Sequence, residues 1–269
     1  AITTVRALNA RGIAATLNAL GEHVADEAGA VAAGDEVVEA LERIHDAGVD
    51  SHVSVKLTRI GLDIDEGLCR AQLVRVLDRA AALGTFIRID MEEASYFERT
   101  VALVEEMVGR YGEATVGVVL QSYRRQHAAE LQRVIAMGAR VRLVKGGYRE
   151  SAAVVFQDRA AIDRAYHEDI EVLLREGHRP AIATHDPDAI AWARQVQARL
   201  GLPNDALEFQ MLYGVRRDLQ RALVRDGYPV RCYVPYGRYF LGYVLGSLRR
   251  IPGGLRRHTP GGPGNSGPS

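Results

Sequence analysis

Residues 140–150 read RVRLVKGGYRE, and this stretch contains the pattern that decides the fold. Residues 140–145 are typical of a buried strand, and in a strand alternate residues share a face, so Arg142, Val144 and Gly146 point to one side. Gly146 and Gly147 then permit either a tight turn into a helix or a close approach of the backbone to a ligand, with N–H groups free to bind an anion. The stretch predicts a strand and a turn whose role is structural or ligand-binding.

The same unit recurs along the chain. Each short apolar run is followed by a segment with apolar residues at i, i+3 and i+4, such as Leu73, Val76 and Leu77 after the second run. The predicted strands are 14–20, 52–57, 86–91, 116–121, 140–145, 180–184, 207–212 and 231–234. Eight strands alternating with helices predict an α/β fold of the (β/α)8, TIM-like barrel type, although an open doubly wound sheet shares the alternation.

Composition limits the classes of function. The chain has 269 residues, 47% hydrophobic and 25% charged, which suffices for a large core. Lys plus Arg and Asp plus Glu both number 34, so the formal net charge is zero, which argues against a nucleic-acid partner and favours a small molecule. Cys69 and Cys232 form no CxxC pair, and neither a signal-like nor a transmembrane apolar run is present. We therefore expect a cytoplasmic protein.

The two ends of the chain differ from the repeating part. Val5, Leu8 and Ile13 share an apolar face, so residues 1–12 are typical of the tail of a helix rather than of a natural beginning. Beyond Pro252 the sequence is rich in Gly, Pro and Ser. We expect a catalytic domain over 1–252 and a disordered tail over 253–269.

Polar residues gather at the carboxyl ends of the predicted strands. They are Lys56, Asp90, Gln121, Arg142, Lys145, Thr184, His185 and Gln210. In a barrel these ends face one mouth, and burying such groups is costly unless they meet a ligand. The pattern therefore favours a binding or catalytic mouth. Asp186 or Thr184 is placed as the N-cap of the next helix, and capping alone would explain Asp186, whereas His185 is either a core imidazole or a cofactor contact. No HExxH, metal-ligand cluster or GxSxG motif occurs, so we expect no metal site.

Taken together, the motifs resemble the proline dehydrogenase family. They are SVKLTRIGLDID, IRIDMEE, VGVVLQSY, VRLVKGGYRE, IATHD, FQMLYG and YVPYG, in the family's order and spacing over residues 9–243. The resemblance implies a distorted (β/α)8 barrel, its last helix over the mouth, with FAD bound non-covalently at the strand ends. It implies a dehydrogenase that passes a hydride from the carbon beside the substrate nitrogen to flavin N5, so that proline becomes 1-pyrroline-5-carboxylate. It also implies a membrane quinone as electron acceptor, reached from the inner face of the membrane.

The resemblance also implies roles for single residues. Arg142 would touch flavin N5, where a cation stabilises the anionic reduced flavin, and Asp90 and Lys56 would complete the catalytic group. The substrate-binding residues would be Lys56, Tyr148, Tyr233 and Tyr243. The cofactor-binding residues would be Gln121, Arg142, Lys145, Gly146, Gly147, Thr184, His185, Asp186, Gln210 and Met211. From the residues alone, Lys56 and Asp90 could equally be a structural ion pair, and Tyr148 and Tyr233 aromatic residues of the rim.

The last helix departs from the family. The family motif Tyr-x-x-Arg-Arg-x-x-Glu, whose arginines clamp the substrate carboxylate, begins at Tyr243, and its arginine positions fall on Gly246 and Ser247. Arg249 and Arg250 follow three residues later, about 300° around a helix and about 4.5 Å along it, and we interpret them as helix-end or surface charges. The departure, with Gly147 where the family commonly has alanine, favours a wider, less cationic pocket. The preferred substrate is then either held differently from the family's proline or is not free proline but a carrier-bound or N-substituted amino acid or another small amine.

Two further functions remain open at this stage. A barrel that retains the fold without turnover would serve as a flavin-binding or protein-interaction module. A lyase or aldolase would use Lys56 or Lys145 as a Schiff-base nucleophile and would need no flavin. Bleaching of bound flavin by an amine without air separates the dehydrogenase from the first alternative, and borohydride trapping identifies the second.

Overall fold

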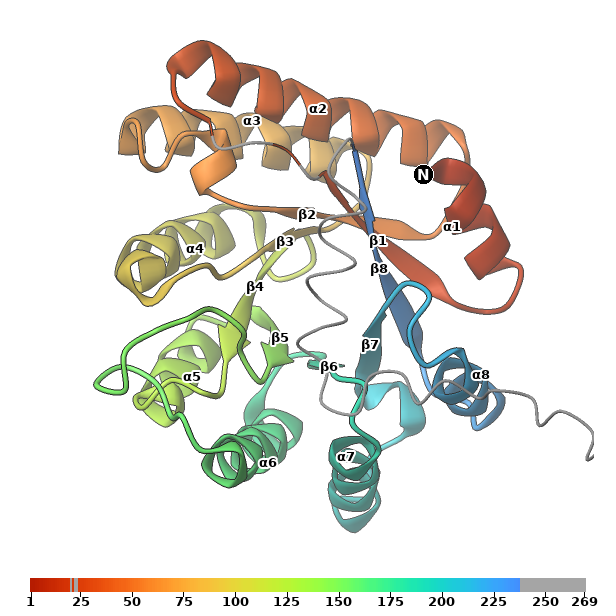
Figure 1. Cartoon of the computed structure of the whole chain (residues 1–269). Coiled ribbons are helices and arrows are strands. Elements are labelled where there is room, and N and C mark those ends of the chain that lie inside the picture. The colour runs from red at the N-terminus through yellow and green to blue at the C-terminus, as the bar shows by residue number, and fades with distance from the viewer. Residues whose placement is uncertain (20, 22–23, 238–269) are drawn as a thin grey trace, which may run out of the picture.

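The computed structural model describes residues 1–19, 21 and 24–237, and these form a closed barrel of parallel strands (Figure 1). Each strand pairs with the next, and β8 closes on β1. The strands are β1 (Ala14–Ala19), β2 (Ser51–Val55), β3 (Ile87–Ile89), β4 (Val116–Gln121), β5 (Arg140–Val144), β6 (Ala181–Ala183), β7 (Glu208–Leu212) and β8 (Val230–Tyr236). The predicted strands and the (β/α)8 fold are confirmed, and the open sheet is excluded.

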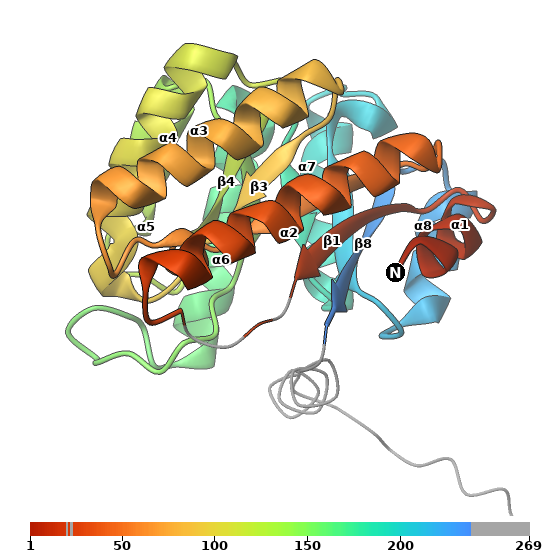
Figure 2. The same cartoon turned by 90° about the horizontal axis from the view of Figure 1, so that it is seen from above.

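Helices surround the barrel, as two perpendicular views show (Figures 1 and 2). They are α1 (Ile2–Asn9), α2 (Glu27–Asp46), α3 (Glu66–Ala82), α4 (Phe97–Tyr111), α5 (His127–Ala136), α6 (Arg159–Glu176), α7 (Pro187–Arg199) and α8 (Arg217–Arg225), with short 3-10 turns at Thr58–Ile60, Ala94–Tyr96 and Asn204–Ala206. The helix expected near the start is α1, whose Val5 and Leu8 are buried. The helix expected after β8 and the Gly/Pro/Ser-rich tail lie outside the described residues.

Aspartates define where several helices begin. Asp26, Asp65, Asp158 and Asp186 precede α2, α3, α6 and α7, and each side chain accepts a hydrogen bond from a backbone N–H of the first turn. An N-cap of this kind is worth about 1 kcal/mol. Because these helices start immediately after strand-to-helix loops, the caps help to fix the loops that surround the mouth.

The two faces of the strands bury different chemistry. The faces toward the helices carry residues such as Val53, Ile87 and Leu143, each at most 1% exposed, and form the apolar core. The lumen carries polar and charged side chains, among them Arg142 and Gln210, which are hydrogen-bonded to each other. The barrel interior is therefore polar where a layered core of branched apolar residues is usual.

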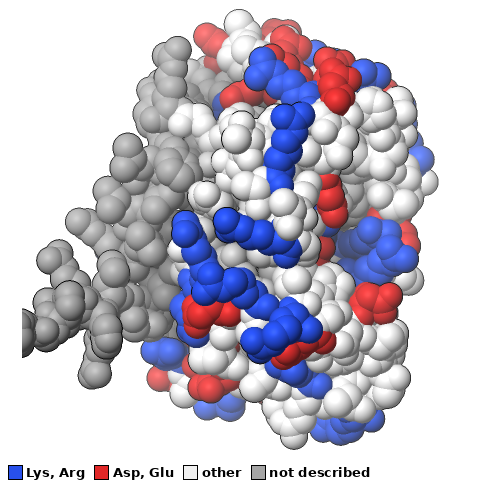
Figure 3. Space-filling model, turned by 90° about the vertical axis from the view of Figure 1, so that its right-hand side faces the viewer, with Lys and Arg blue, Asp and Glu red and all other residues white. Residues whose placement is uncertain are grey.

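The outer surface mixes charges of both signs. Figure 3 shows the side on which α7 and α8 lie, with basic and acidic side chains interspersed. Arg194 pairs with Asp226 at 3.1 Å and Arg216 with Asp218 at 2.8 Å. Within the described part of the chain, no helix has both the length and the apolar character needed to span a bilayer.

Candidate active site

A cavity of about 330 Å³ opens at the carboxyl ends of the strands. Most of the residues that sequence reasoning assigned to the site line it: Lys56, Asp90, Gln121, Arg142, Gly146, Gly147, Tyr148, His185, Gln210, Met211 and Tyr233. The remaining wall is apolar and comes from Met91, Val119, Val144, Ala183 and Leu212. The closed barrel thus brings residues from seven of its strands, β2 to β8, or from the loops after them to one mouth, with polar groups below and apolar walls around them.

Three other assigned residues lie outside this lining. The Lys145 ammonium group is paired with Asp163 at 2.5 Å and with Asp186 at 2.6 Å, and Thr184 Oγ1 accepts a hydrogen bond from the N–H of Asp186 at 3.0 Å. Asp186 also caps α7, as expected. These contacts connect the loops after β5 and β6 behind the cavity, so a cofactor role for Lys145, Thr184 and Asp186 stays a prediction. Tyr243, Gly246, Ser247, Arg249 and Arg250 lie outside the described residues.

Asp90 is the centre of the polar floor. Arg142 Nη1 lies 3.0 Å from its Oδ1, Lys56 Nζ lies 3.5 Å from its Oδ2, and the Tyr233 hydroxyl donates to Oδ2 at 3.2 Å. Ser54 Oγ also donates to Oδ1. Burial would raise the pKa of this carboxyl, but the positive charges of Lys56 and Arg142 outweigh it, and the net effect is a lowered pKa. Asp90 is therefore a carboxylate at neutral pH.

Arg142 is held on two sides of its guanidinium group. Besides Nη1, which contacts Asp90, its Nε donates to Gln210 Oε1 at 2.6 Å, and its planar group lies over the Tyr233 ring, 5.4 Å from the centroid. Its side chain is only 6% exposed. Among the described residues none accepts a hydrogen bond from its Nη2, so this nitrogen retains donors for a ligand.

Two floor residues were not singled out from the sequence. Asn18 Nδ2 donates to the Tyr233 hydroxyl, and Ser54 donates to Asp90. A signal was present, because Ser54 lies two residues before Lys56 on the same face of β2, and Asn18 lies two residues after Thr16 on one face of β1, whose other residues are apolar. Each is a small polar residue among apolar ones, and only the closure of β1 against β8 shows that Asn18 reaches Tyr233.

Glycine occupies the two positions after β5 for different structural reasons. Gly146 has φ +113°, and a Cβ there would overlap the Tyr123 ring. Gly147 has no atom within 4 Å of the corresponding position. Gly146 is therefore required by the backbone and by packing, whereas Gly147 leaves space beside the cavity. The next residue, Tyr148, has a raised pKa because it is buried, and it remains a neutral phenol.

His185 and Gln121 present defined hydrogen-bonding groups. The N–H of Leu212 donates to His185 Nε2 at 2.8 Å, and burial lowers the pKa of His185 to about 4, so the ring is neutral with its proton on Nδ1. Gln121 Nε2 donates to the Glu92 carbonyl at 3.4 Å, while its buried Oε1 has no partner among the residues that the structure describes. An unused acceptor in a cavity wall is a group that a ligand N–H would satisfy.

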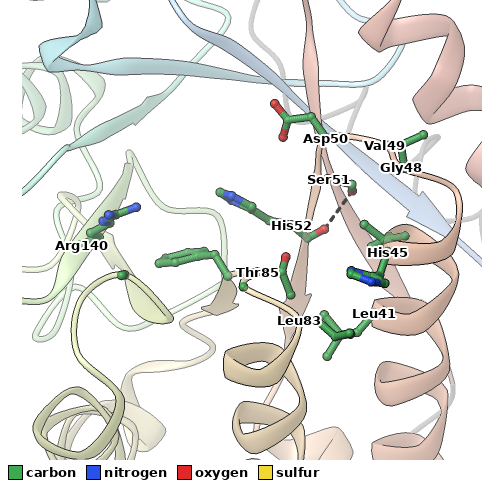
Figure 4. A pocket seen from close by; sticks show the side chains of 14 residues that line it. Leu41, His45, Gly48, Val49, Asp50, Ser51, His52, Leu83, Thr85 and Arg140 are labelled. Carbon is green, nitrogen blue, oxygen red and sulfur yellow. Dashed lines mark hydrogen bonds between the residues drawn. The ribbon is translucent and has the colours of Figure 1, made fainter.

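A second cavity, of about 430 Å³, lies at the amino ends of the strands (Figure 4). The His52 side chain extends from β2 toward the side where Arg140 lies, and His45 of α2 lies on the other side (Figure 4). The His52 ring packs against Phe86 with centroids 4.8 Å apart, and Arg140 pairs with Glu113 at 3.4 Å. Burial is the main cause that holds the pKa of His52 well below its ordinary value, and the positive charges of nearby arginines lower it further, so this imidazole is neutral.

The closed barrel and its polar mouth define an enzyme of the (β/α)8 class that acts on a small molecule. The family model described as proline dehydrogenase matches residues 1–245. The chain belongs to the proline dehydrogenase family, flavin-dependent oxidoreductases that act on CH–NH groups.

Curated relatives support this assignment, and a solved structure shares the fold. The chain is 36% identical over 252 residues to proline dehydrogenase 1 of Bacillus subtilis (strain 168), covering 94% of this chain and 83% of that one. It is 37% identical over 257 residues to proline dehydrogenase of Deinococcus radiodurans, covering 94% and 82%. Proline utilization A from Bdellovibrio bacteriovorus, inactivated by N-propargylglycine, shares the fold with a TM-score of 0.85 at 24% identity over 91% of this chain. The present chain spans 30% of that longer chain.

Proposed function

We propose that this chain binds FAD and oxidises proline, or a proline-like secondary amine, to an imine. The observation that carries the proposal is the Asp90 carboxylate, held between Lys56 and Arg142 on the floor of the mouth cavity in a member of this family. A carboxylate that stays ionised beside two cations is suited to positioning an amine, and a fixed cation is suited to stabilising charge that develops on a cofactor.

The cavity wall fits an isoalloxazine ring by the chemistry of its free groups. The ring edge carries N–H donors and carbonyl acceptors; Gln121 Oε1 offers an unused acceptor, and Arg142 Nη2 offers unused donors. The neutral His185 ring and the apolar Met211 and Val144 would cover its faces. When bound, FAD would supply the acceptor for the hydride. Lys145, Thr184 and Asp186 would support this wall from behind.

The substrate would lie between the floor and the tyrosines. Asp90 would hold the substrate nitrogen, Lys56 would keep Asp90 ionised, and Tyr148 and Tyr233 would flank the ring. Tyr233 is itself oriented, because its hydroxyl donates to Asp90 and accepts from Asn18. These residues would orient the amine and exclude water from the reacting carbon.

A second candidate substrate class has its own basis in the sequence. Gly246 and Ser247 stand where the family has its carboxylate-clamping arginines, and Gly147 adds open space at the cavity. A carboxylate without these arginines would forgo about 1.5–3 kcal/mol for each charge-assisted hydrogen bond. We propose that N-substituted or carrier-bound amino acids, or other small amines, compete with free proline as substrate. Tyr243 would still contact the substrate from this segment.

The experiment is anaerobic reduction of the FAD-loaded protein, followed at the flavin absorption band. The amines are proline, N-methylproline, prolinamide and pyrrolidine, the last two without a free carboxylate. Rapid reduction by millimolar proline with slow reduction by the others supports a proline dehydrogenase and contradicts the altered substrate. Preference for prolinamide or pyrrolidine supports the second candidate. A bound flavin that no amine reduces contradicts dehydrogenase activity and leaves a flavin-binding module.

The electron acceptor and the domain limits are further parts of the proposal. We propose a membrane quinone as acceptor, met at the inner face of the membrane, and a single catalytic domain over residues 1–252. Reoxidation of the reduced protein by a short-chain quinone much faster than by dioxygen would support the quinone as acceptor. A truncation after residue 252 that retains bound flavin and turnover would support the domain limits.

A further inference from the structure

A series of hydrogen bonds, buried at Arg142 and partly buried at Glu208, continues from Arg142 toward the amino end of the barrel. Arg142 Nε donates to Gln210 Oε1 at 2.6 Å, and Gln210 Nε2 donates to Glu208 Oε1 at 2.6 Å. Glu208 in turn accepts from Arg231 Nε at 3.0 Å on both carboxylate oxygens. Arg231 is also bound to the carbonyl of Ala15 at 2.7 Å. A series of four side chains thus runs from Arg142 at the mouth, through Gln210 and Glu208, to Arg231 at the opposite end of the lumen.

The register of the strands makes this series of hydrogen bonds possible. Glu208 and Gln210 lie two residues apart on β7 and share a face. Gln210 is paired in register with Arg231 of β8, and on the other side with Ala183 of β6, whose small side chain leaves space in the lumen. Arg142, Gln210 and Arg231 are each at most 6% exposed, so water has little access to replace a lost partner.

The order of donors and acceptors fixes the Gln210 amide. An arginine only donates and an ionised carboxylate only accepts, so Gln210 must turn its oxygen to Arg142 and its nitrogen to Glu208. The flipped amide would place donor against donor and acceptor against acceptor. Without Glu208 the amide nitrogen would lose the partner that holds this orientation. The fixed oxygen is the acceptor that, with Asp90, sets the rotation of the Arg142 guanidinium group and leaves Nη2 for the cavity.

We propose that Glu208 and Arg231 are positioning residues, which act through Gln210 to hold Arg142 in its working orientation at the mouth. The orientation itself is a property of the protein alone, whereas its effect on catalysis rests on the proposed function. The competing explanation is that Glu208 and Arg231 are only a structural ion pair at the amino end, where the Glu208 side chain is 23% exposed.

The test compares Glu208→Leu and Glu208→Gln with a matched control, Glu130→Leu. Glu130 is likewise a carboxylate paired with an arginine, Arg124 at 2.7 Å, and is more deeply buried than Glu208, but it lies on α5, outside the lumen. The first readout is the ¹⁵N–¹H signal of Arg142 Nε in the protein with and without FAD, assigned by its loss in Arg142→Lys. The second is the rate of anaerobic flavin reduction by the best amine.

Glu208→Leu should shift the Arg142 Nε signal, speed its exchange with solvent and slow flavin reduction by about 10- to 100-fold, the range typical of outer-shell partners. Glu208→Gln retains an acceptor oxygen for Gln210 and should stay within about threefold of the unmodified protein in rate. Glu130→Leu should leave the signal and the rate unchanged. If Glu208→Leu does not fold, Glu208→Met provides the same comparison, because it also removes the acceptor of Gln210 Nε2 while retaining a long unbranched side chain.

An unchanged Arg142 signal in a folded Glu208→Leu protein would overturn the proposal. Equal loss of rate in Glu130→Leu and Glu208→Leu would also overturn it, because general destabilisation would then explain both. If no amine reduces the flavin in the unmodified protein while the Arg142 signal responds as expected, the proposed function fails and the positioning role stands. The two proposals are therefore tested separately.

Discussion

Both ends of the barrel lumen bury charged side chains, but the charges are used differently. At the carboxyl end, Asp90 and Arg142 lie beneath a cavity of about 330 Å³, and Arg142 retains a nitrogen that no described residue satisfies. At the amino end, Arg231 is paired with Glu208, and Arg88 donates to the carbonyl oxygens of Val118 and Arg140 and packs over the Phe86 ring at 4.7 Å. Arg88 also has an Nε without a partner among the described residues, but it lines none of the cavities described above. Burial of a charge alone therefore does not mark a site; a buried charge that faces open space with unused hydrogen-bonding capacity does.

The largest expected effect separates the two buried arginines Arg142 and Arg88. Arg142→Met should reduce the rate of flavin reduction at least about 10³-fold, an electrostatic loss of roughly 4 kcal/mol. Arg88→Met should leave this rate within about threefold, because Arg88 lines neither cavity and its hydrogen bonds within the described residues go to backbone carbonyls. Stopped-flow absorbance measures both, with chemical unfolding as a check on stability. Equal losses in both variants would show that the two ends are not functionally distinct.

The adjacent glycines give the next comparison. Gly146→Ala forces a side chain onto a backbone with φ +113° and into the Tyr123 ring, so we expect about 1–3 kcal/mol of lost stability and weaker FAD binding. Gly147→Ala meets open space and should change the unfolding free energy by less than about 0.5 kcal/mol. Urea unfolding and FAD titration measure the two effects. Similar costs at both positions would contradict the geometry described for this loop.

The smallest effect concerns the response of the two ends to acid. The pKa of His52 is lowered by burial, so the unfolded chain takes up a proton below pH 6.5 while the folded protein does not, and stability falls with acidification by at most about 1.4 kcal/mol per pH unit. His52→Gln should therefore flatten the dependence of unfolding free energy on pH between 6.5 and 5. The pKa of Asp90 is lowered too. The ionised Asp90 carboxylate therefore makes its full contribution to stability above the ordinary aspartate pKa, and this contribution is lost only as the pH falls below about 4. Asp90→Asn should thus lower stability by a constant amount over the same range. If Asp90→Asn instead flattened the dependence of unfolding free energy on pH between 6.5 and 5, these separate roles of His52 and Asp90 would be contradicted.

Much of the site could be predicted from the sequence because a barrel converts position along a strand into position in space. Polar residues at strand ends, such as Gln121 and Gln210, had to meet at one mouth once eight strands alternated with helices. Lys145 shows the limit of this reasoning. It ends its strand like Lys56 does, yet it lies off the lumen face and pairs with Asp163 and Asp186 instead of lining the cavity.

The sequence by itself determined the fold, through the spacing of its apolar runs, and the family, through the order of its motifs. Counting positions from the YVPYG motif also predicts that Gly246 and Ser247 stand where the family has its arginines, a prediction about two residues just beyond the matched range 1–245. Tertiary structure alone decided which polar side chains contact one another. Glu208 and Arg142 are 66 residues apart in the chain, and their connection through Gln210 exists only because the barrel closes and sets β5, β6, β7 and β8 in register. Periodicity specifies which face a side chain occupies, whereas hydrogen bonds across a lumen depend on the relative heights of strands, which no local pattern encodes.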